Sequence, residues 1–181
     1  MMNYNKLSRI ISQALRHEPE KYNIIIDKNG WANVGDLIIG IQKHLIEYES
    51  IRLEDIQRAI SFAEKKRHEL KDGMIRAIYG HSINIEVKYE EQLPPDVLYH
   101  GTSEKAYGVI LAEGLKSMQR KYVHLSSVKK DAYEIGKRKE ECPVILRIDS
   151  GKAYKSGVCF FYTESNIWLT EFVPIEFIDK E

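Results

Sequence analysis

Apolar residues near the N-terminus recur at the spacing of an amphipathic helix. The positions i, i+3, i+4, i+7 and i+8 are filled in turn by Leu7, Ile10, Ile11, Ala14 and Leu15. This spacing places them on one helix face. Pro19 disfavours helical geometry at the residue before it. We therefore expect a helix that ends near His17 and carries the pair Arg16-His17 at its C-terminal end.

The rest of the N-terminal half predicts two further helices and two turns. Residues 23–34 have the pattern of a short strand, an Asn29-Gly30 turn and a second short strand. Asn33 is a suitable N-cap for a helix over about residues 34–46. A third apolar stripe covers residues 52–65, and a hairpin is expected around Asp72-Gly73. Three helices followed by a hairpin is the order of a winged-helix module.

The clearest boundary signal is the segment EEQLPPDV, residues 90–97, which joins charged residues to a Pro-Pro pair. Consecutive prolines stiffen a chain and end strand pairing. We therefore place two domains at residues 1–92 and 93–181. After the boundary, short strands such as VLYHGT alternate with helices, one of them capped by Ser103. The predicted fold class is α+β, in two lobes.

Charge is balanced along the whole chain of 181 residues. Lys and Arg together number 27, as do Asp and Glu. The balance holds in each half, with 14 basic and 14 acidic residues in 1–92 and 13 of each in 93–181. Neither half is a polycation, so recognition of a nucleic acid or a phosphate must use a local cluster of charge.

The two cysteines, Cys142 and Cys159, form no Cys-x-x-Cys motif and are too few for a disulfide framework. Their apolar, strand-like surroundings predict two buried thiols in a reducing compartment. The N-terminus lacks the apolar run of a secretory signal, and no apolar stretch approaches the length of a membrane span. We expect a soluble, cytoplasmic protein with no membrane contact, and a monomer.

Two candidate chemical groups lie in the first half. Arg16-His17 has two interpretations. In the structural one, the cations complement the helix dipole, and in the functional one, they bind an anion. Arg76 lies between Ile75 and Ala77, so it points to the opposite face of its strand, either to solvent or to a ligand. Gly80-His81-Ser82 follows and supplies main-chain and hydroxyl donors of the kind that hold phosphate.

The second half contributes two similar stretches. In one, His100 ends a strand and is followed by Gly101 and Thr102, which suits a ligand held by main-chain groups. In the other, Arg120 precedes His124, Ser126 and Ser127. The structural alternatives are that His100 ends a strand beside a helix cap, and that His124 is a hydrogen-bonded histidine of the core. No metal motif, Rossmann fingerprint, P-loop or hydrolase elbow is present in the sequence, and we expect no metal.

Taken in order along the chain, these segments resemble the RNA 2′-phosphotransferase family, called KptA in bacteria and archaea. The matching segments are LSRIISQALRHEP, DKNGWANVGDLI, IRAIYGHSI, PPDVLYHGT, EGLKSMQRKYVHLSS, PVILRID and FYTESNIWLTEFVP. Each is unspecific alone, but seven in order over nearly the whole chain are highly specific. One departure is Tyr79, which stands where many relatives have glutamine.

The resemblance implies an N-terminal winged-helix RNA lobe and a C-terminal ADP-ribosyltransferase-like lobe that binds NAD. It implies NAD-dependent removal of an internal 2′-phosphate from RNA, of the kind left at a tRNA splice junction. NAD is consumed as a co-substrate, and nicotinamide and ADP-ribose 1″,2″-cyclic phosphate are released. The partners are then NAD and 2′-phosphorylated RNA.

The resemblance also assigns roles to residues. The implied catalytic set is Arg16, His17, Arg76 and Arg120. The implied NAD-binding residues are His100, Gly101, Thr102, His124, Ser126 and Ser127, and the implied RNA-binding residues are His81 and Ser82. Ile167 occupies the third-motif position where many ADP-ribosyltransferases carry an acidic residue, with Glu164 nearby. An acceptor phosphate is already anionic and needs no carboxylate to activate it.

Two other functions remain open. One is an ADP-ribosyltransferase that acts on another acceptor, such as a terminal nucleic-acid phosphate or a protein. The other is a winged-helix RNA-binding protein whose second lobe is vestigial. Retention of Arg16, His17, Arg76, Arg120, His100 and His124 argues against a vestigial site.

Overall fold

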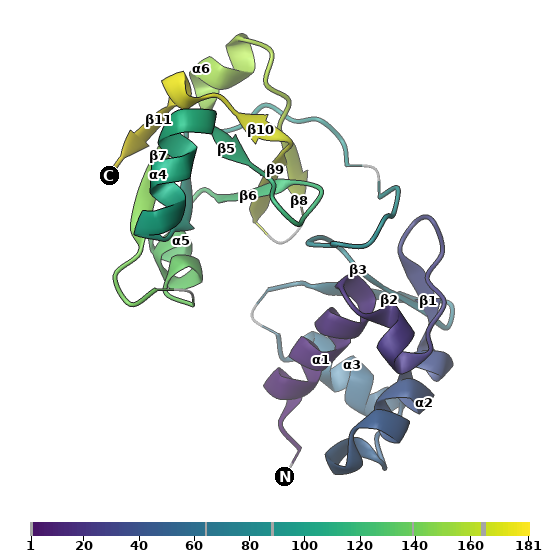
Figure 1. Cartoon of the computed structure of the whole chain (residues 1–181). Coiled ribbons are helices and arrows are strands. Elements are labelled where there is room, and N and C mark those ends of the chain that lie inside the picture. The colour runs from purple at the N-terminus through teal and green to yellow at the C-terminus, as the bar shows by residue number, and fades with distance from the viewer. Residues whose placement is uncertain (1, 64, 88, 139, 164–165) are drawn as a thin grey trace. The chain divides into compact units, whose positions relative to one another are not determined.

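The computed structural model describes residues 2–63, 65–87, 89–138, 140–163 and 166–181. Contacts within the chain divide it into two compact units, Met1–Lys88 and Tyr89–Glu181 (Figure 1). Each unit combines helices with strands that pair antiparallel, so the α+β class predicted from the sequence is confirmed. Within the described residues, no helix is both long enough and apolar enough to cross a membrane.

The helices of unit 1 begin and end close to where the sequence predicts. Helix α1 spans Tyr4–Arg16, and the side chain of Asn3 caps it by accepting from the Lys6 N–H. Helix α2 spans Val34–His44, and the Asn33 side chain accepts from the N–H groups of its first turn. Helix α3 spans Leu53–Ser61. Two short 3₁₀ turns complete the helical part, η1 (Pro19–Tyr22) and η2 (Ile46–Tyr48).

A three-stranded sheet in the order β1-β3-β2 accompanies these helices. Its strands are β1 (Trp31–Asn33), β2 (His68–Lys71) and β3 (Met74–Ala77). Strands β2 and β3 form the predicted hairpin. Asp72 and Gly73 both have positive φ, at 50° and 74°, as a two-residue turn of this kind requires.

The strand predicted over the first part of residues 23–34 is wrong. The structure has no strand between η1 and β1, because Asp27 organises a local turn instead. Its Oδ1 accepts from the N–H groups of Asn29 and Trp31, at 2.9 and 2.8 Å. Strand β1 then pairs with β3, which is more than forty residues away in the chain.

The core of unit 1 lies between the helices and one face of the sheet. Ile75 and Ala77 of β3 are fully buried, which leaves Arg76 on the opposite face. Helix α1 buries the apolar stripe read from the sequence. The main fully buried members of this core are Leu7, Ile11, Ala14, Leu15, Leu37, Ile41, Ile56, Ile75 and Ala77.

Unit 2 is built on a six-stranded antiparallel sheet in the order β11-β7-β4-β6-β9-β8. Its strands are β4 (Val97–Thr102), β6 (Val123–Ser126), β7 (Val144–Asp149), β8 (Phe161–Thr163), β9 (Ile167–Thr170) and β11 (Ile178–Lys180). A second, two-stranded sheet pairs β5 (Leu115–Lys116) with β10 (Phe172–Val173). The helices are α4 (Glu104–Glu113), α5 (Lys129–Gly136) and α6 (Ser150–Lys155), with a 3₁₀ turn η3 (Ile175–Phe177).

The segment that opens unit 2 is tied to its sheet. Glu91 forms a bridge with Phe161, and the Gln92 N–H donates to the Phe160 carbonyl at 2.9 Å. The Tyr89 ring meets the Tyr122 ring edge-on, with centroids 5.5 Å apart. Residues 89–92 therefore pack with the second unit.

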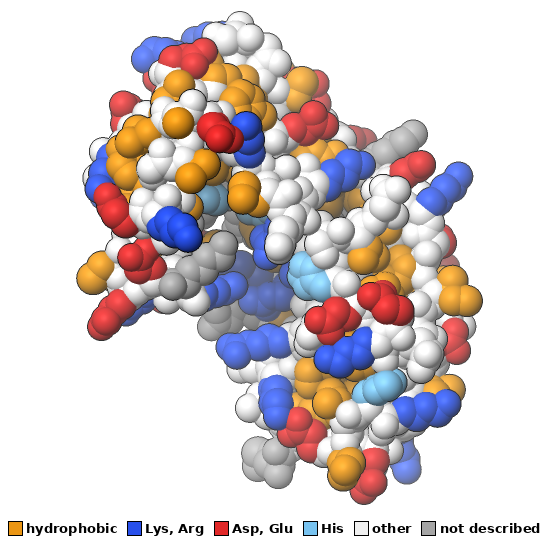
Figure 2. Space-filling model, in the orientation of Figure 1, with side chains coloured by type: hydrophobic (Ala, Val, Ile, Leu, Met, Phe, Trp, Pro, Cys, Tyr) orange, Lys and Arg blue, Asp and Glu red, His pale blue; other side chains and the backbone are white. Residues whose placement is uncertain are grey.

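The expectation of buried cysteines is wrong. Cys142 and Cys159 are both free thiols with exposed side chains. Each lies just before a strand, β7 or β8, rather than within it. Buried apolar residues follow each cysteine closely, with Val144 at the start of β7 and Phe160 just before β8. Figure 2 shows one face of the molecule, on which both basic and acidic side chains are exposed.

Candidate functional site

The Arg16-His17 pair ends α1 and is fastened to the segment that follows the hairpin. The Arg16 carbonyl accepts from the Ser82 N–H at 3.0 Å and from the Ser82 hydroxyl at 3.3 Å. Ser82 Oγ also lies 2.9 Å from Nδ1 of the exposed His17 ring. If the hydroxyl donates to the carbonyl, its oxygen accepts from His17 Nδ1–H. Ser82 thus joins the helix end to the residues after β3 and orients the imidazole.

The Arg16 guanidinium stacks over the Tyr79 ring, with Cζ 4.8 Å from the ring centroid. Gly80 follows with φ at +86°, a conformation that favours glycine. A Cβ built on Gly80 would lie 3.5 Å from Arg16 Nη1. The backbone at Gly80 therefore passes close against the guanidinium, and Tyr79, the departure noted above, supplies the surface on which it rests.

Arg76 lies at the centre of a row of three cross-strand neighbours. The register pairs it with Trp31 of β1 on one side and with Glu69 of β2 on the other. Both its Nε and its Nη2 approach Glu69 Oε2, at 2.8 and 2.6 Å. Its Cζ lies 4.6 Å from the Trp31 ring centroid. We call these three residues the Arg76 row.

His81 is buried beside these cations. Its side chain is only 5% exposed, and its Nε2 has no hydrogen-bond partner among the residues that the structure describes. Burial is the main cause that lowers the pKa of His81 to about 3, followed by the charges of Arg16, His17 and Arg76 in that order. His81 is therefore neutral near pH 7. All three predicted catalytic residues of unit 1 lie close enough to act on this one ring.

The structure places the predicted RNA-binding residues differently from each other. His81 is an interior residue, packed where a Cβ on Gly30 would lie 3.7 Å from its Nε2. Ser82 is exposed and contacts Arg16 and His17. In this structure, therefore, His81 helps to shape the cluster of cations, and Ser82 connects its parts.

In unit 2, the two predicted histidines lie together on neighbouring strands. His100 of β4 approaches the His124 carbonyl through Nδ1 at 2.9 Å, and His124 of β6 approaches the Tyr122 carbonyl through Nδ1 at 3.0 Å. A carbonyl only accepts, so both Nδ1 atoms carry a proton. Both rings are held by main-chain groups through Nδ1, which fixes the orientation of each imidazole in the sheet.

The other predicted NAD-binding residues differ in burial. Thr102 and Ser126 are buried, and Ser126 Oγ accepts from the Val128 N–H at 3.2 Å. Ser127 is exposed and lies two residues before α5. A Cβ built on Gly101 would lie 2.0 Å from the Ala132 carbonyl oxygen, so glycine here allows α5 to pack against β4. This is a packing role for a glycine that the sequence suggested would lie against a ligand.

Arg120 belongs to unit 2, in the exposed turn between β5 and β6, where its N–H donates to the Ser117 carbonyl at 3.0 Å. Ile167 opens β9 and is buried. Glu164, the acidic residue considered for the third motif, lies outside the described residues. No group of three or more His, Cys, Asp or Glu in the described part of the chain is arranged to hold a metal ion.

Sequence reasoning missed Trp31 and Glu69, which contact Arg76 directly. Both lie in segments that were read as parts of hairpins, but neither carries a local signal of function. The signal is the register of the sheet, which depends on pairing between strands that are distant in the sequence.

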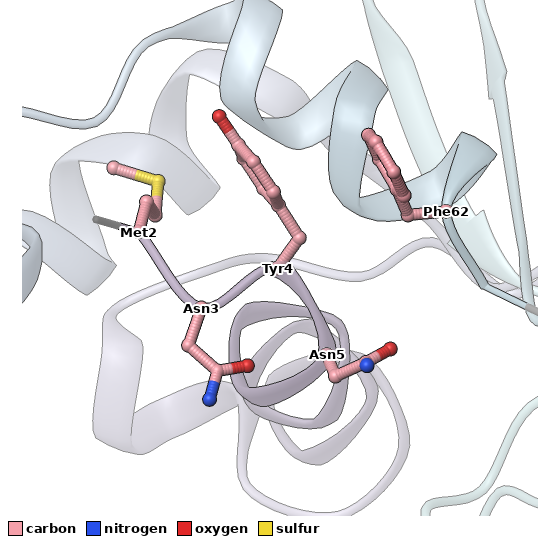
Figure 3. A pocket seen from close by; sticks show the side chains of 5 residues that line it. All are labelled: Met2, Asn3, Tyr4, Asn5 and Phe62. Atoms are coloured by element: carbon pink, nitrogen blue, oxygen red, sulfur yellow. The ribbon is translucent and has the colours of Figure 1, made fainter.

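One pocket lies at the opposite end of α1 from Arg16. It has a volume of about 370 Å³ and is lined by Met2, Asn3, Tyr4, Asn5 and Phe62. Figure 3 shows the Tyr4 and Phe62 rings near one another above the start of the helix. Their centroids are 5.7 Å apart and the rings are nearly parallel, at 5°. A helix of thirteen residues separates this pocket from the cations.

Comparison with known proteins identifies what the chain resembles. The model of a family described as RNA 2′-phosphotransferase, Tpt1 / KptA family, matches residues 3–172. A probable RNA 2′-phosphotransferase of Bacillus thuringiensis is 44% identical over 97% of this chain and 94% of its own length. Proteins with the same description from Fusobacterium nucleatum and Acetivibrio thermocellus are 41% and 34% identical, over 98% and 100% of this chain and 99% of each relative.

Proposed function

Because the chain belongs to the RNA 2′-phosphotransferase, Tpt1 / KptA family, we propose that it removes an internal 2′-phosphate from RNA in a reaction that consumes NAD. In this proposal, unit 1 is a winged-helix RNA lobe and unit 2 is an ADP-ribosyltransferase-like lobe that binds NAD. The observation that carries the proposal is that Ser82, which follows the strand of Arg76, is hydrogen-bonded to both Arg16 and His17.

The proposed reaction has two steps. An oxygen of the RNA 2′-phosphate attacks C1″ of the nicotinamide ribose, and the C1″–N bond to nicotinamide breaks. The ribose 2″-hydroxyl then attacks phosphorus, and the bond between phosphorus and the RNA 2′-oxygen breaks. The products are RNA with a 2′-hydroxyl, nicotinamide and ADP-ribose 1″,2″-cyclic phosphate.

The residues of unit 1 suit the phosphate. A phosphomonoester carries close to two negative charges near neutral pH, and guanidinium groups bind such oxygens bidentately. Arg16 and Arg76 are both held by aromatic faces, at Tyr79 and Trp31. Groups held in place before the reaction stabilise the charge of a phosphoryl transition state without reorganising, an effect worth several kcal/mol.

His17 is placed to supply the proton that the leaving RNA 2′-oxygen needs. Its Nδ1 is engaged with Ser82 Oγ, so proton transfer to the substrate uses the other ring nitrogen, Nε2. A structural role as a helix cap does not explain why the Arg16 carbonyl and the His17 imidazole are both hydrogen-bonded to Ser82. The negative end of the α1 dipole disfavours an anion here, and the arginine charges must overcome it.

The residues of unit 2 offer polar groups at fixed positions, which suits the sugar and ring systems of NAD. His100 and His124 are fixed by carbonyl groups through Nδ1, so the orientation of each imidazole is set before a ligand binds. Thr102 adds a buried hydroxyl. Arg120, in the same unit, keeps the phosphate-binding role that the family resemblance implies, and that role is part of the proposal.

The test is an incubation of the protein with an oligonucleotide that carries one internal 2′-phosphate, with and without NAD. Both the RNA and the nucleotide products are resolved. We expect NAD-dependent conversion to 2′-hydroxyl RNA together with ADP-ribose 1″,2″-cyclic phosphate. ADP-ribosylated RNA that goes no further would indicate an ADP-ribosyltransferase for another acceptor. Tight RNA binding with no consumption of NAD would indicate a binding protein.

A further inference from the structure

We propose that Glu69 and Trp31 are positioning residues that aim the Arg76 guanidinium at the 2′-phosphate. The inference rests on the proposed function, because it takes that phosphate as the ligand of Arg76. Neither residue carries a sequence signal of chemistry. Their assignment comes from the register of the three-stranded sheet, which sets one on each side of Arg76.

The contacts of Glu69 define which edge of the guanidinium is used. A guanidinium offers a side edge, formed by Nε and one terminal nitrogen, and an end edge, formed by the two terminal nitrogens. Glu69 Oε2 takes the side edge, at 2.8 Å from Nε and 2.6 Å from Nη2. Within the described residues, this leaves Nη1 and the second hydrogen of Nη2 as the edge for a ligand. That end edge matches two oxygens of a phosphate.

Trp31 fixes the plane of the same group. The Arg76 Cζ lies 4.6 Å from the centroid of the indole, within the range of a favourable cation–π contact. The carboxylate sets rotation within the plane, and the indole sets the plane itself. Together, the two contacts fix the direction in which the end edge of the guanidinium points.

The ion pair is suited to orienting the arginine rather than to stabilising the fold. The Arg76 and Glu69 side chains are 30% and 34% exposed, and pairs of this exposure add little to stability. The negative charge of Glu69 also weakens the attraction between Arg76 and a phosphate. A carboxylate would not be expected here if the site were built for affinity alone. Its benefit is that the guanidinium no longer has to be ordered when the substrate binds.

The experiment compares Glu69→Ala with Glu69→Gln and Trp31→Ala with Trp31→Phe in the full chain. Glutamine keeps an acceptor oxygen on the side edge, and phenylalanine keeps an aromatic face. We expect kcat/KM for the 2′-phosphorylated oligonucleotide to fall about 10- to 100-fold in each alanine variant, because small misplacements of a positioned group have effects of this size. The conservative variants should stay within about threefold of the parent, and the KM for NAD should not change.

Two further measurements separate positioning from a loss of folded protein. Hydrogen exchange at Arg76 Nε–H, followed by ¹H–¹⁵N NMR and assigned through Arg76→Lys, should accelerate in Glu69→Ala and remain slow in Glu69→Gln. Glu47→Ala removes another exposed ion pair of unit 1, with Lys6, and should leave both readouts at parent values.

Several results would overturn the inference. Parent-like or higher turnover in Glu69→Ala would show that the carboxylate is neutral or competes with phosphate. Equal impairment of Glu69→Ala and Glu69→Gln would show that the acceptor oxygen is not what matters. If the parent protein does not act on 2′-phosphorylated RNA, the proposed function fails. Oligonucleotide affinity and Nε–H exchange then decide separately whether Glu69 orients Arg76 toward a phosphate.

Discussion

The two units hold their candidate residues in opposite ways. In unit 1, the candidates include two arginines from separate places, Arg16 at the end of α1 and Arg76 within β3. They are held by side chains, with Tyr79 beneath Arg16 and the Arg76 row around Arg76. In unit 2, His100 and His124 lie on adjacent strands and are held by backbone carbonyls.

The difference indicates a division of tasks. Mobile cationic side chains need supports that fix their direction before a highly charged ligand arrives. Imidazoles held by the backbone carbonyls of a sheet need only the sheet to be intact. The function of unit 1 should therefore be sensitive to changes in its supporting side chains. The function of unit 2 should be sensitive to changes in its backbone packing.

The largest effect should come from His17→Ala, which removes the proposed proton donor while leaving the arginines in place. Because general acid catalysis contributes about 10²- to 10⁴-fold, phosphate release should slow by that factor. Gel analysis of the reaction should show ADP-ribosylated RNA accumulating, since the first step does not need this proton. Lys21→Ala, an exposed neighbour paired with Glu18, is the matched control. Turnover at the parent rate in His17→Ala would contradict the assignment of proton donation to His17 of unit 1.

Gly101→Ala tests the claim that unit 2 depends on backbone packing. The new Cβ would lie 2.0 Å from the Ala132 carbonyl oxygen, so α5 or β4 must move. We expect the free energy of unfolding to fall by about 3 kcal/mol or more, at the upper end of overpacking effects. Gly108→Ala is the control, because its Cβ meets nothing within 4 Å and alanine should stabilise α4 by about 0.5 to 1 kcal/mol. Urea unfolding curves that coincide for the two variants would contradict the packing role.

Acid should destabilise unit 1 through two buried histidines. Burial is the main cause that lowers the pKa of both His68 and His81 to about 3, with Arg16 the next cause for each. Unfolding restores a pKa of about 6.5, so the unfolded chain binds more protons below that pH and stability falls from pH 6.5 toward 3. At pH 4.5 the expected loss is on the order of 2 to 3 kcal/mol per histidine.

The pH effect is measured as the change in unfolding free energy between pH 7 and 4.5, compared for the parent, His68→Gln and His81→Gln. Each variant should lose less stability on acidification than the parent, whatever its stability at pH 7. Hydrogen exchange at pH 4.5 should quicken first in the amides of unit 1. A pH dependence that both variants share with the parent would mean that these histidines do not carry it.

The smallest effect is expected for His100→Ala. This change removes one imidazole and its bond to the His124 carbonyl, but it leaves the sheet intact. The KM for NAD should rise about tenfold, equivalent to about 1.4 kcal/mol, while affinity for the 2′-phosphorylated oligonucleotide stays constant. Lys105→Ala, on the exposed side of α4, serves as control. If RNA affinity in His100→Ala also fell about tenfold, the assignment of NAD to unit 2 and RNA to unit 1 would be contradicted.

Most of the local structure and the residue types of the candidate site could be predicted from the sequence alone. The stripe in α1, the caps at Asn33 and Ser103 and the turn at Asp72-Gly73 all depend on contacts within a few residues. Such contacts leave their spacing in the sequence, which is why these elements were predicted correctly. The ordered motifs likewise identified Arg16, His17, Arg76 and the histidines before any geometry was known.

The surroundings of those residues depend on tertiary contacts, which could not be predicted from the sequence. The register that puts Trp31 and Glu69 beside Arg76 links three strands, one of them more than thirty residues from the others. Burial of His81, exposure of Cys142 and Cys159, and the contact of Gly101 with α5 are likewise set by distant segments. The physical reason is that pairing and burial are interactions between segments far apart in the chain, and the local sequence does not record which segment its partner will be.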